Sequence, residues 1–199
     1  MVRPKRIRRY KKTTDSNHSQ IVAPSKFNRK FSPLKPNEVW TSDMTYLRTR
    51  EGWLYLYVWI DLYSRKVVGW SIANHMRASL VRNALQDALS RRPGTHPLVH
   101  SDCGSQYAST ELRTILWRHR LRQSLSRKGD CWDNAPTESF FGTLKQQLDI
   151  YCLRPSATLK DEIIEYIEIF YNRRRLHSSL GYKAPEEFDN EYWSVKAAS

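Results

Sequence analysis

The sequence has few cysteines and no long apolar run. Its three cysteines, Cys103, Cys131 and Cys152, are too few and too scattered for a disulfide framework or a Cys-x-x-Cys zinc site. The longest apolar run covers residues 53–60, far short of the ~20 residues that a membrane-spanning helix needs. No apolar stretch follows the basic N-terminus as it does in a signal peptide. We therefore expect a cytoplasmic protein without a membrane partner.

Negative charge is scarce at the start of the chain. Residues 1–35 hold eleven of the 33 Lys and Arg and a single acid, Asp15, so this N-terminal arm carries +10 of the net charge of +13. Such an arm is typical of a segment that binds a polyanion. A solvated, disordered leader is an equal alternative. Both interpretations predict an extended or disordered arm that contributes little to the core.

The rest of the chain predicts a single domain, residues 36–190, followed by a tail at 191–199. Three runs of aromatic and β-branched residues with short turn-like connections indicate an antiparallel meander. Helical patterns then alternate with two short strand-like runs. The predicted strands are 39–47, 53–61, 66–73, 97–100 and 122–126, and the predicted helices are 78–90, 110–120, 136–148 and 158–171. This order, β-β-β-α-β-α-β-α, predicts an α/β fold: a mixed five-stranded sheet flanked by helices, with an additional C-terminal helix.

Three acids stand out by their context. Asp43 lies inside the first strand, where a carboxylate is costly to bury unless it is paired or bound to a metal. The strand period of two places it on the face of Thr41 and Thr45. Asp102 directly follows the fourth strand, and ligands of open α/β sheets usually bind at such strand ends. Glu138 opens the third helix.

Each acid also has a purely structural interpretation. Asp43 could be a satisfied buried acid or keep an edge strand soluble, Asp102 could cap a turn, and Glu138 could complement its helix dipole. Together they favour a site for hard cations such as Mg²⁺ or Mn²⁺, because carboxylate-only sites suit these ions and no His/Cys cluster competes for zinc. Carboxylates that converge on two cations about 4 Å apart are typical of enzymes that cleave or transfer phosphodiesters.

Six motifs extend this pattern over most of the chain. They are WTSDMTY at 40–46, DLYSRKVVGW at 61–70, HSDxGSQY at 100–107, SxSRKGDCWDNA at 124–135, ESFFxxLK at 138–145 and YNRRRLH at 171–177. With these motifs, and with 35 residues between Asp102 and Glu138, residues 37–188 resemble the integrase catalytic core of the DDE recombinases, in particular the OrfB-type transposases of bacterial insertion sequences. The resemblance implies a ribonuclease H-like fold in which Asp43, Asp102 and Glu138 are catalytic and hold two Mg²⁺ or Mn²⁺ ions.

The resemblance also implies a function: DNA binding and metal-dependent phosphodiester cleavage and strand transfer in transposition, DNA integration and recombination, in the bacterial cytoplasm. The implied partners are the DNA of the element ends and of the target, and a second copy of the chain or a full-length transposase. Two departures stand out. Cys103 replaces a usual Arg, and the helix-turn-helix segments that precede the core in complete family members are expected to be missing. The alternatives are therefore a non-catalytic DNA-binding remnant that modulates a full-length transposase, and a ribonuclease H-type nuclease.

Basic and aromatic residues near the motifs are candidate contacts to DNA. Lys145 follows Glu138 by two helical turns and shares its face, so it could reach a phosphate; a solvated lysine is the alternative. Trp132 could stack on a base or pack inward. Asn134 either orients Glu138 or caps the helix, and His177 is a supporting residue of open role. The candidate DNA contacts are Lys145, Arg127, Lys128, Trp132, Arg173, Arg174 and Arg175. Asp61, at the end of the second strand, is expected to cap the turn that follows.

Overall fold

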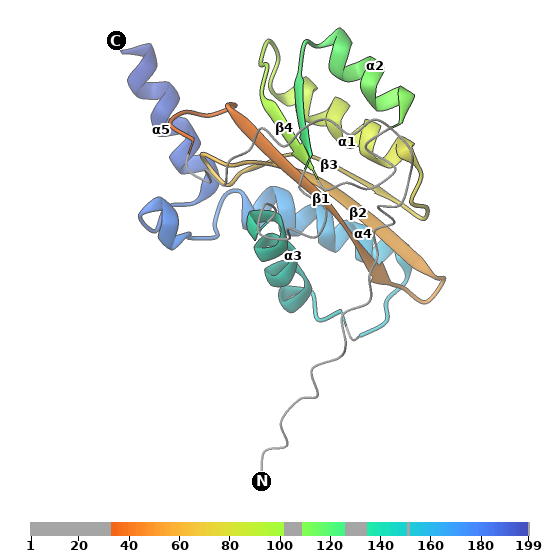
Figure 1. The fold of residues 1–199 in the computed structure, drawn as a ribbon. Helices are drawn as coiled ribbons and strands as arrows, with labels where there is room; N and C mark the ends of the chain where they lie inside the picture. The colour runs from red at the N-terminus through yellow and green to blue at the C-terminus, as the bar shows by residue number, and fades with distance from the viewer. Residues whose placement is uncertain (1–32, 102–108, 126–134, 151, 199) are drawn as a thin grey trace.

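A computed structural model describes residues 33–101, 109–125, 135–150 and 152–198 (Figure 1). The strands are β1 (Val39–Arg48), β2 (Trp53–Asp61), β3 (Val67–Ala73), β4 (Leu98–Ser101) and β5 (Arg122–Leu125). The helices are α1 (Ala78–Arg91), α2 (Thr110–Arg118), α3 (Ala135–Gln147), α4 (Ser156–Glu165), the π-helix η3 (Tyr166–Tyr171), the 3₁₀-helix η4 (Ser178–Leu180) and α5 (Pro185–Ala197). Within these described ranges, no helix combines the length and the apolarity that crossing a membrane requires.

The five strands form one mixed sheet in the order β3-β2-β1-β4-β5. β1 pairs antiparallel with β2, and β2 with β3, because short turns join them. β4 pairs parallel with β1, and β5 with β4. Each of these parallel strands follows a helix that returns the chain to the same end of the sheet. The predicted α/β fold class is therefore confirmed.

Two cores lie on the two faces of the sheet. On one face, α1 and α2 pack against residues such as Trp40, Tyr57 and Trp59; on the other, α3 and α4 pack against residues such as Val58 and Ile60. Figure 1 shows these two helix pairs on opposite sides of the central strands. Because β2 is covered on both faces, its sequence is almost continuously apolar rather than alternating.

Helix α1 approaches the sheet closely at Gly69 of β3. A Cβ atom at Gly69 would lie 2.5 Å from the Cβ of Ala88 and 2.6 Å from the carbonyl oxygen of Ala84. The absence of a side chain therefore permits this packing. Asp87 of α1 also accepts a hydrogen bond of 3.1 Å from the backbone N–H of Trp70.

The C-terminal part differs from the sequence prediction in two ways. The helix predicted at 158–171 begins at Ser156 and changes to π-helical geometry in η3. Helix α5 was not predicted, and it continues past residue 190, the expected end of the domain. Only Pro185 and Asp189 of α5 are buried, so the helix has no apolar stripe that a helical period could reveal. It is attached by ring contacts of Tyr63 with Phe188 and Tyr192.

Candidate functional site

Asp43 lies in the middle of β1, on the face of the sheet that α3 covers. Its partner in the antiparallel register is Val58 of β2, which belongs to the α3 core. Asp43 is half-buried, and its Oδ1 accepts a hydrogen bond of 2.7 Å from the backbone N–H of Met44. Trp40 belongs to the opposite core and Leu47 to the α3 core, which confirms the predicted alternation along β1.

Glu138 lies in the first turn of α3 with its side chain exposed. The apolar residues Phe140, Phe141 and Leu144 anchor α3 on the sheet. The helix therefore carries Glu138 on the same side of the sheet as Asp43 and leaves its carboxylate open to solvent and to a ligand. Glu138 at this position can complement the helix dipole and can also bind a ligand.

The third predicted ligand, Asp102, lies outside the described residues, but the strand before it does not. β4 runs parallel to β1 and places His100 beside Thr41, two residues before Asp43 in the chain. The last described residue of β4 therefore ends next to the strand that carries Asp43. Among the described residues, no three His, Cys, Asp or Glu side chains gather in a metal-holding group. Of the predicted triad, however, only Asp43 and Glu138 belong to the described residues.

Buried polar contacts fix the end of β4. The Ser42 Oγ donates to the His100 carbonyl oxygen at 3.2 Å and accepts a hydrogen bond of 2.6 Å from the Tyr57 hydroxyl. The His100 Nδ1 lies 3.2 Å from the Ser124 Oγ of β5. Burial lowers the pKa of His100 to about 4, so its ring is neutral at physiological pH. The sequence motifs assign these residues no role, although polar side chains inside short strands are a signal for such a network.

Lys145 reaches the surroundings of Asp43 from the last turn of α3. Its Nζ lies 5.9 Å from the centre of the Tyr46 ring, a cation–π geometry. Burial lowers the pKa of Lys145, and the charge of Asp43 acts against this effect. The structure therefore brings together Lys145 and Asp43, which the sequence analysis named separately.

The basic cluster after η3 divides into three different environments. The Arg173 Nε lies 3.0 Å from Glu186 Oε2 in an ion pair, Arg174 is exposed, and Arg175 is half-buried beside His177. These three arginines do not act as one uniform patch. The predicted residues Arg127, Lys128, Trp132 and Asn134 lie outside the described residues.

The first residues of the YNRRRLH motif are structural. The buried Asn172 accepts a hydrogen bond of 2.9 Å from the Val67 N–H and donates one of 3.1 Å to the Val67 carbonyl. The hydroxyl of Tyr171 donates to the Arg65 carbonyl at 3.1 Å, and its ring packs edge-on against Phe140, with centroids 4.7 Å apart. This part of the motif joins η3 to the start of β3, the turn before it and α3.

Asp61 has the turn-capping role predicted for it. Its buried carboxylate accepts hydrogen bonds from the backbone N–H groups of Asn37 (2.6 Å), Tyr63 (2.7 Å) and Ser64 (3.3 Å). Burial raises the pKa of Asp61 to about 6.

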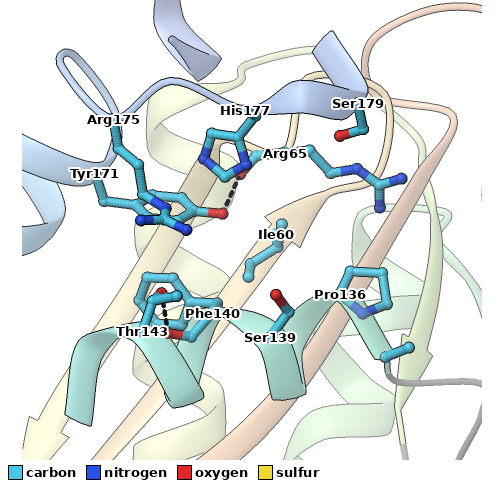
Figure 2. Close-up of a pocket in the computed structure, with 11 residues that line it drawn as sticks. Ile60, Arg65, Pro136, Ser139, Phe140, Thr143, Tyr171, Arg175, His177 and Ser179 are labelled. Carbon is cyan, nitrogen blue, oxygen red and sulfur yellow. Dashed lines mark hydrogen bonds between the residues drawn. The ribbon is translucent and has the colours of Figure 1, made fainter. Parts of the chain in front are cut away.

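A cavity of about 330 Å³ lies beside the first turns of α3 (Figure 2). It is lined by Ile60, Arg65, Ala135, Pro136, Ser139, Phe140, Thr143, Tyr171, Arg175, His177 and Ser179. Its walls come from β2, the turn after β2, α3 and the segment after η3. The sequence does not single out Arg65 or Ser139, because the cavity joins residues that are far apart in the chain.

The strand order, the two helix layers and an acid in the central strand define a ribonuclease H-like α/β protein. Two family models, both described as "Integrase core domain", match residues 33–131 and 119–185. The chain is 44% identical over 198 residues to the "Insertion element IS600 uncharacterized 31 kDa protein" of Shigella sonnei, covering 98% of this chain and 73% of that protein. It is 43% identical over 196 residues to the "Transposase InsF for insertion sequence IS3fB" of Escherichia coli K12, covering 96% and 67%.

A solved structure supports the same fold. The HTLV-2 integrase catalytic core domain in complex with magnesium superposes with a TM-score of 0.62 at 22% identity, covering 78% of this chain and 98% of that chain. The chain belongs to the insertion-sequence transposases with an integrase core domain. It is therefore a transposase/integrase catalytic core of the DDE superfamily.

Proposed function

We propose that this chain binds DNA and, with divalent cations, cleaves a phosphodiester and transfers the strand end to a second DNA site. One observation carries the proposal: Asp43 lies half-buried in the central strand, facing the helix whose first turn carries Glu138. The end of β4, which precedes Asp102, lies beside the same strand. Asp43 and Glu138 come from a strand and a helix that are far apart in the sequence. Folding alone does not require their two carboxylates to lie on the same side of the sheet.

The donor set fits a hard divalent cation. Asp43 and Glu138 offer carboxylate oxygens, and Asp102 is the proposed third ligand. When bound, Mg²⁺ or Mn²⁺ supplies activation of the attacking oxygen and charge stabilisation at the phosphate. Two ions at this site are part of the proposal.

The protein groups provide orientation and charge. The exposed carboxylate of Glu138 is accessible to a DNA strand, while the half-buried Asp43 is held by the Met44 N–H. Lys145, close to Asp43, is placed to pair with a phosphate next to the acids. Further proposed DNA contacts are Arg127, Lys128, Trp132, Arg173, Arg174 and Arg175, together with the basic arm at residues 1–35.

The proposed reaction has two in-line displacements at phosphorus. In the first, water attacks the phosphodiester, a P–O bond to water forms, and the bond to the 3′-oxygen breaks, which leaves a 3′-hydroxyl and a 5′-phosphate. In the second, this 3′-hydroxyl attacks a phosphodiester of the target, so one P–O bond replaces another. No external energy source is needed, and no covalent bond to the protein forms.

Cleavage of DNA by the purified chain tests the proposal. The substrate is a DNA hairpin or a nicked duplex end, incubated with Mg²⁺, with Mn²⁺ or with EDTA. We expect cleavage only with a divalent cation, and none with Asp43→Asn. DNA binding without cleavage in any cation would instead support a non-catalytic remnant, and cleavage confined to the RNA strand of a hybrid would support a ribonuclease H-type nuclease.

A further inference from the structure

The cavity beside α3 has a positive lining. Figure 2 shows it between α3 and the segment after η3, with Arg175 and Arg65 on either side of His177. Among the described residues, the lining includes two guanidinium groups and no acid. Burial lowers the pKa of His177 to about 4, and the positive charges of Arg175 and Arg65 contribute to this shift. The cavity therefore combines positive potential with a neutral imidazole.

Two buried polar atoms in this cavity find no hydrogen-bond partner within the described part of the chain. They are the Nε of Arg175 and the Nε2 of His177. Leaving such atoms unsatisfied costs free energy, so an unsatisfied pair in one cavity is a sign of a ligand. The Nε of arginine is always a donor, and a donor beside fixed positive charge selects an anion.

Ring and hydrogen-bond contacts hold the walls of the cavity. The Tyr171 ring lies edge-on to the His177 ring, with centroids 5.2 Å apart, and the Tyr171 hydroxyl holds the backbone of Arg65. Arg65 has a φ of 60°, a left-handed conformation that is unfavourable for a residue with a side chain. Strain of this kind is commonly retained where a side chain serves a site. The Thr143 hydroxyl donates to the Phe140 carbonyl at 2.9 Å, which leaves the exposed Ser139 as the hydroxyl on α3 that is open to a ligand.

The cavity adjoins the candidate active site. Its lining residues Pro136 and Ser139 flank Glu138 in the first turn of α3. On the sheet, Ile60 lies two residues after Val58, the partner of Asp43 in the register. The cavity therefore lies next to Glu138, on the face of the sheet that carries Asp43.

We propose that the cavity binds a backbone phosphate of the DNA strand, one or a few nucleotides away from the phosphodiester that is cleaved. Arg175, Arg65 and Ser139 hold the phosphate oxygens, and the site fixes the register of the strand relative to Glu138. The volume of about 330 Å³ is at the small end of ligand pockets, which span about 300–1,000 Å³, and suits one phosphate with part of its nucleotide. This inference rests on the proposed function, because DNA is the assumed ligand.

Nuclear magnetic resonance provides a direct test on the full chain. The Nε–H signal of Arg175 and the ring signals of His177 are followed while inorganic phosphate or the dinucleotide pTpT is added. We expect saturable shifts of both signals with pTpT, and weaker affinity for phosphate alone. Ser139→Ala, an exposed substitution that leaves the Arg175 signal observable, should weaken pTpT binding by about tenfold through loss of a hydrogen bond to a charged group.

A second experiment, with DNA, identifies which backbone phosphate the cavity binds. Oligonucleotides that carry one uncharged methylphosphonate at successive positions near the cleaved bond are bound to the wild-type chain and to Arg175→Gln. We expect the wild type to lose about tenfold in affinity at one position. Arg175→Gln should lose no affinity at that same position. Arg77→Gln, an exposed charge before α1 on the other face of the sheet, is the control and should behave as the wild type.

The outcomes separate this inference from the proposed function. Shifts with phosphate but not with pTpT would overturn the DNA assignment, as would equal position profiles for the wild type and Arg175→Gln. Absence of any shift at DNA concentrations that saturate binding would overturn the site itself. A failed cleavage test with the pTpT shifts intact would reject the proposed catalysis and support the phosphate site.

Discussion

Lys145 of α3 lies close enough to Asp43 of β1 for their charges to interact. The charge of the carboxylate raises the pKa of the lysine, while burial, the larger effect, lowers it. The aromatic face of Tyr46, 5.9 Å from the Nζ, provides a second attraction for the ammonium group. A half-buried cation next to half-buried acid is the environment in which a phosphate can be held beside divalent cations.

Neutral variants of the three acids test the site directly. Asp43→Asn, Asp102→Asn and Glu138→Gln should each lower cleavage and strand transfer by at least about a thousandfold, because each removes charge needed to hold the cations. The fold should remain, since Asp43 is only half-buried and Glu138 is exposed. Rates with Mg²⁺ and circular dichroism spectra check both statements. The control is Glu165→Gln, an exposed acid of α4, and near wild-type activity in any of the three variants would disprove the assignment.

Metal binding should be visible without any substrate. A ligand that binds only the folded state stabilises it by about 2.7 kcal/mol at a hundred times its dissociation constant. For a chain of this size the melting temperature should rise by roughly 5–10 °C with saturating Mg²⁺ or Mn²⁺. Differential scanning calorimetry of the wild type and of Asp43→Asn checks this expectation.

The matching controls concern charge and zinc. Asp43→Asn should lose the response to Mg²⁺, and in metal-free buffer its melting temperature should equal or exceed that of the wild type, because one of several clustered negative charges is gone. A zinc-selective chelator should have no effect on stability. Unfolding on chelation would show that the cysteines had been misinterpreted.

Much of the fold was predictable because local patterns and packing agree. The apolar run of β2 and the alternation around Asp43 follow directly from which faces of the sheet are covered. Helix α5 was not predictable, because Asp189 is one of its two buried residues and is held by an ion pair with Arg92, with 2.6 Å between Nη2 and Oδ2, rather than by an apolar stripe.

The site was predictable only in part. The acids stand out because each occupies an unusual place in a local pattern, and Lys145 follows from helical spacing. The cavity that Arg65, Ser139 and Arg175 line was not predictable. Its residues become neighbours only when η3 packs against α3 and the β2–β3 turn. Likewise, the two hydrogen bonds between Asn172 and Val67 depend on a contact between distant segments.

The neutral state of His100 should make stability depend on pH. Burial lowers the pKa of His100 from 6.5 to about 4, so between these values the unfolded chain binds more protons than the folded one. This contribution to stability is fully present above pH 6.5 and is lost as the pH falls toward 4. Its full size is about 3 kcal/mol.

Urea unfolding of the wild type and of His100→Gln between pH 4 and 7 checks this expectation. The variant should show a flatter loss of the free energy of unfolding on acidification. Asp61, whose pKa is raised to about 6 by burial, acts in the opposite direction, and His177 acts in the same direction as His100. Both are unchanged in the variant, so the difference between the two curves isolates His100. Parallel curves would contradict the assignment of a buried neutral ring.

The basic arm should dominate non-specific binding to duplex DNA. It holds +10 of the net charge of +13, and each phosphate that a protein neutralises adds about −0.9 to the slope of log affinity against log salt. Deletion of residues 1–35 should therefore make this slope less negative by several units. The domain should stay folded, because β1 begins at Val39 and the described residues Leu34 and Lys35 contact Glu38 at the surface.

The measurement is fluorescence anisotropy with a labelled duplex at several salt concentrations, for the full chain and for 36–199. Equal slopes would mean that the phosphate contacts come from the domain instead, from Lys145, Arg127, Lys128 and the cluster at 173–175.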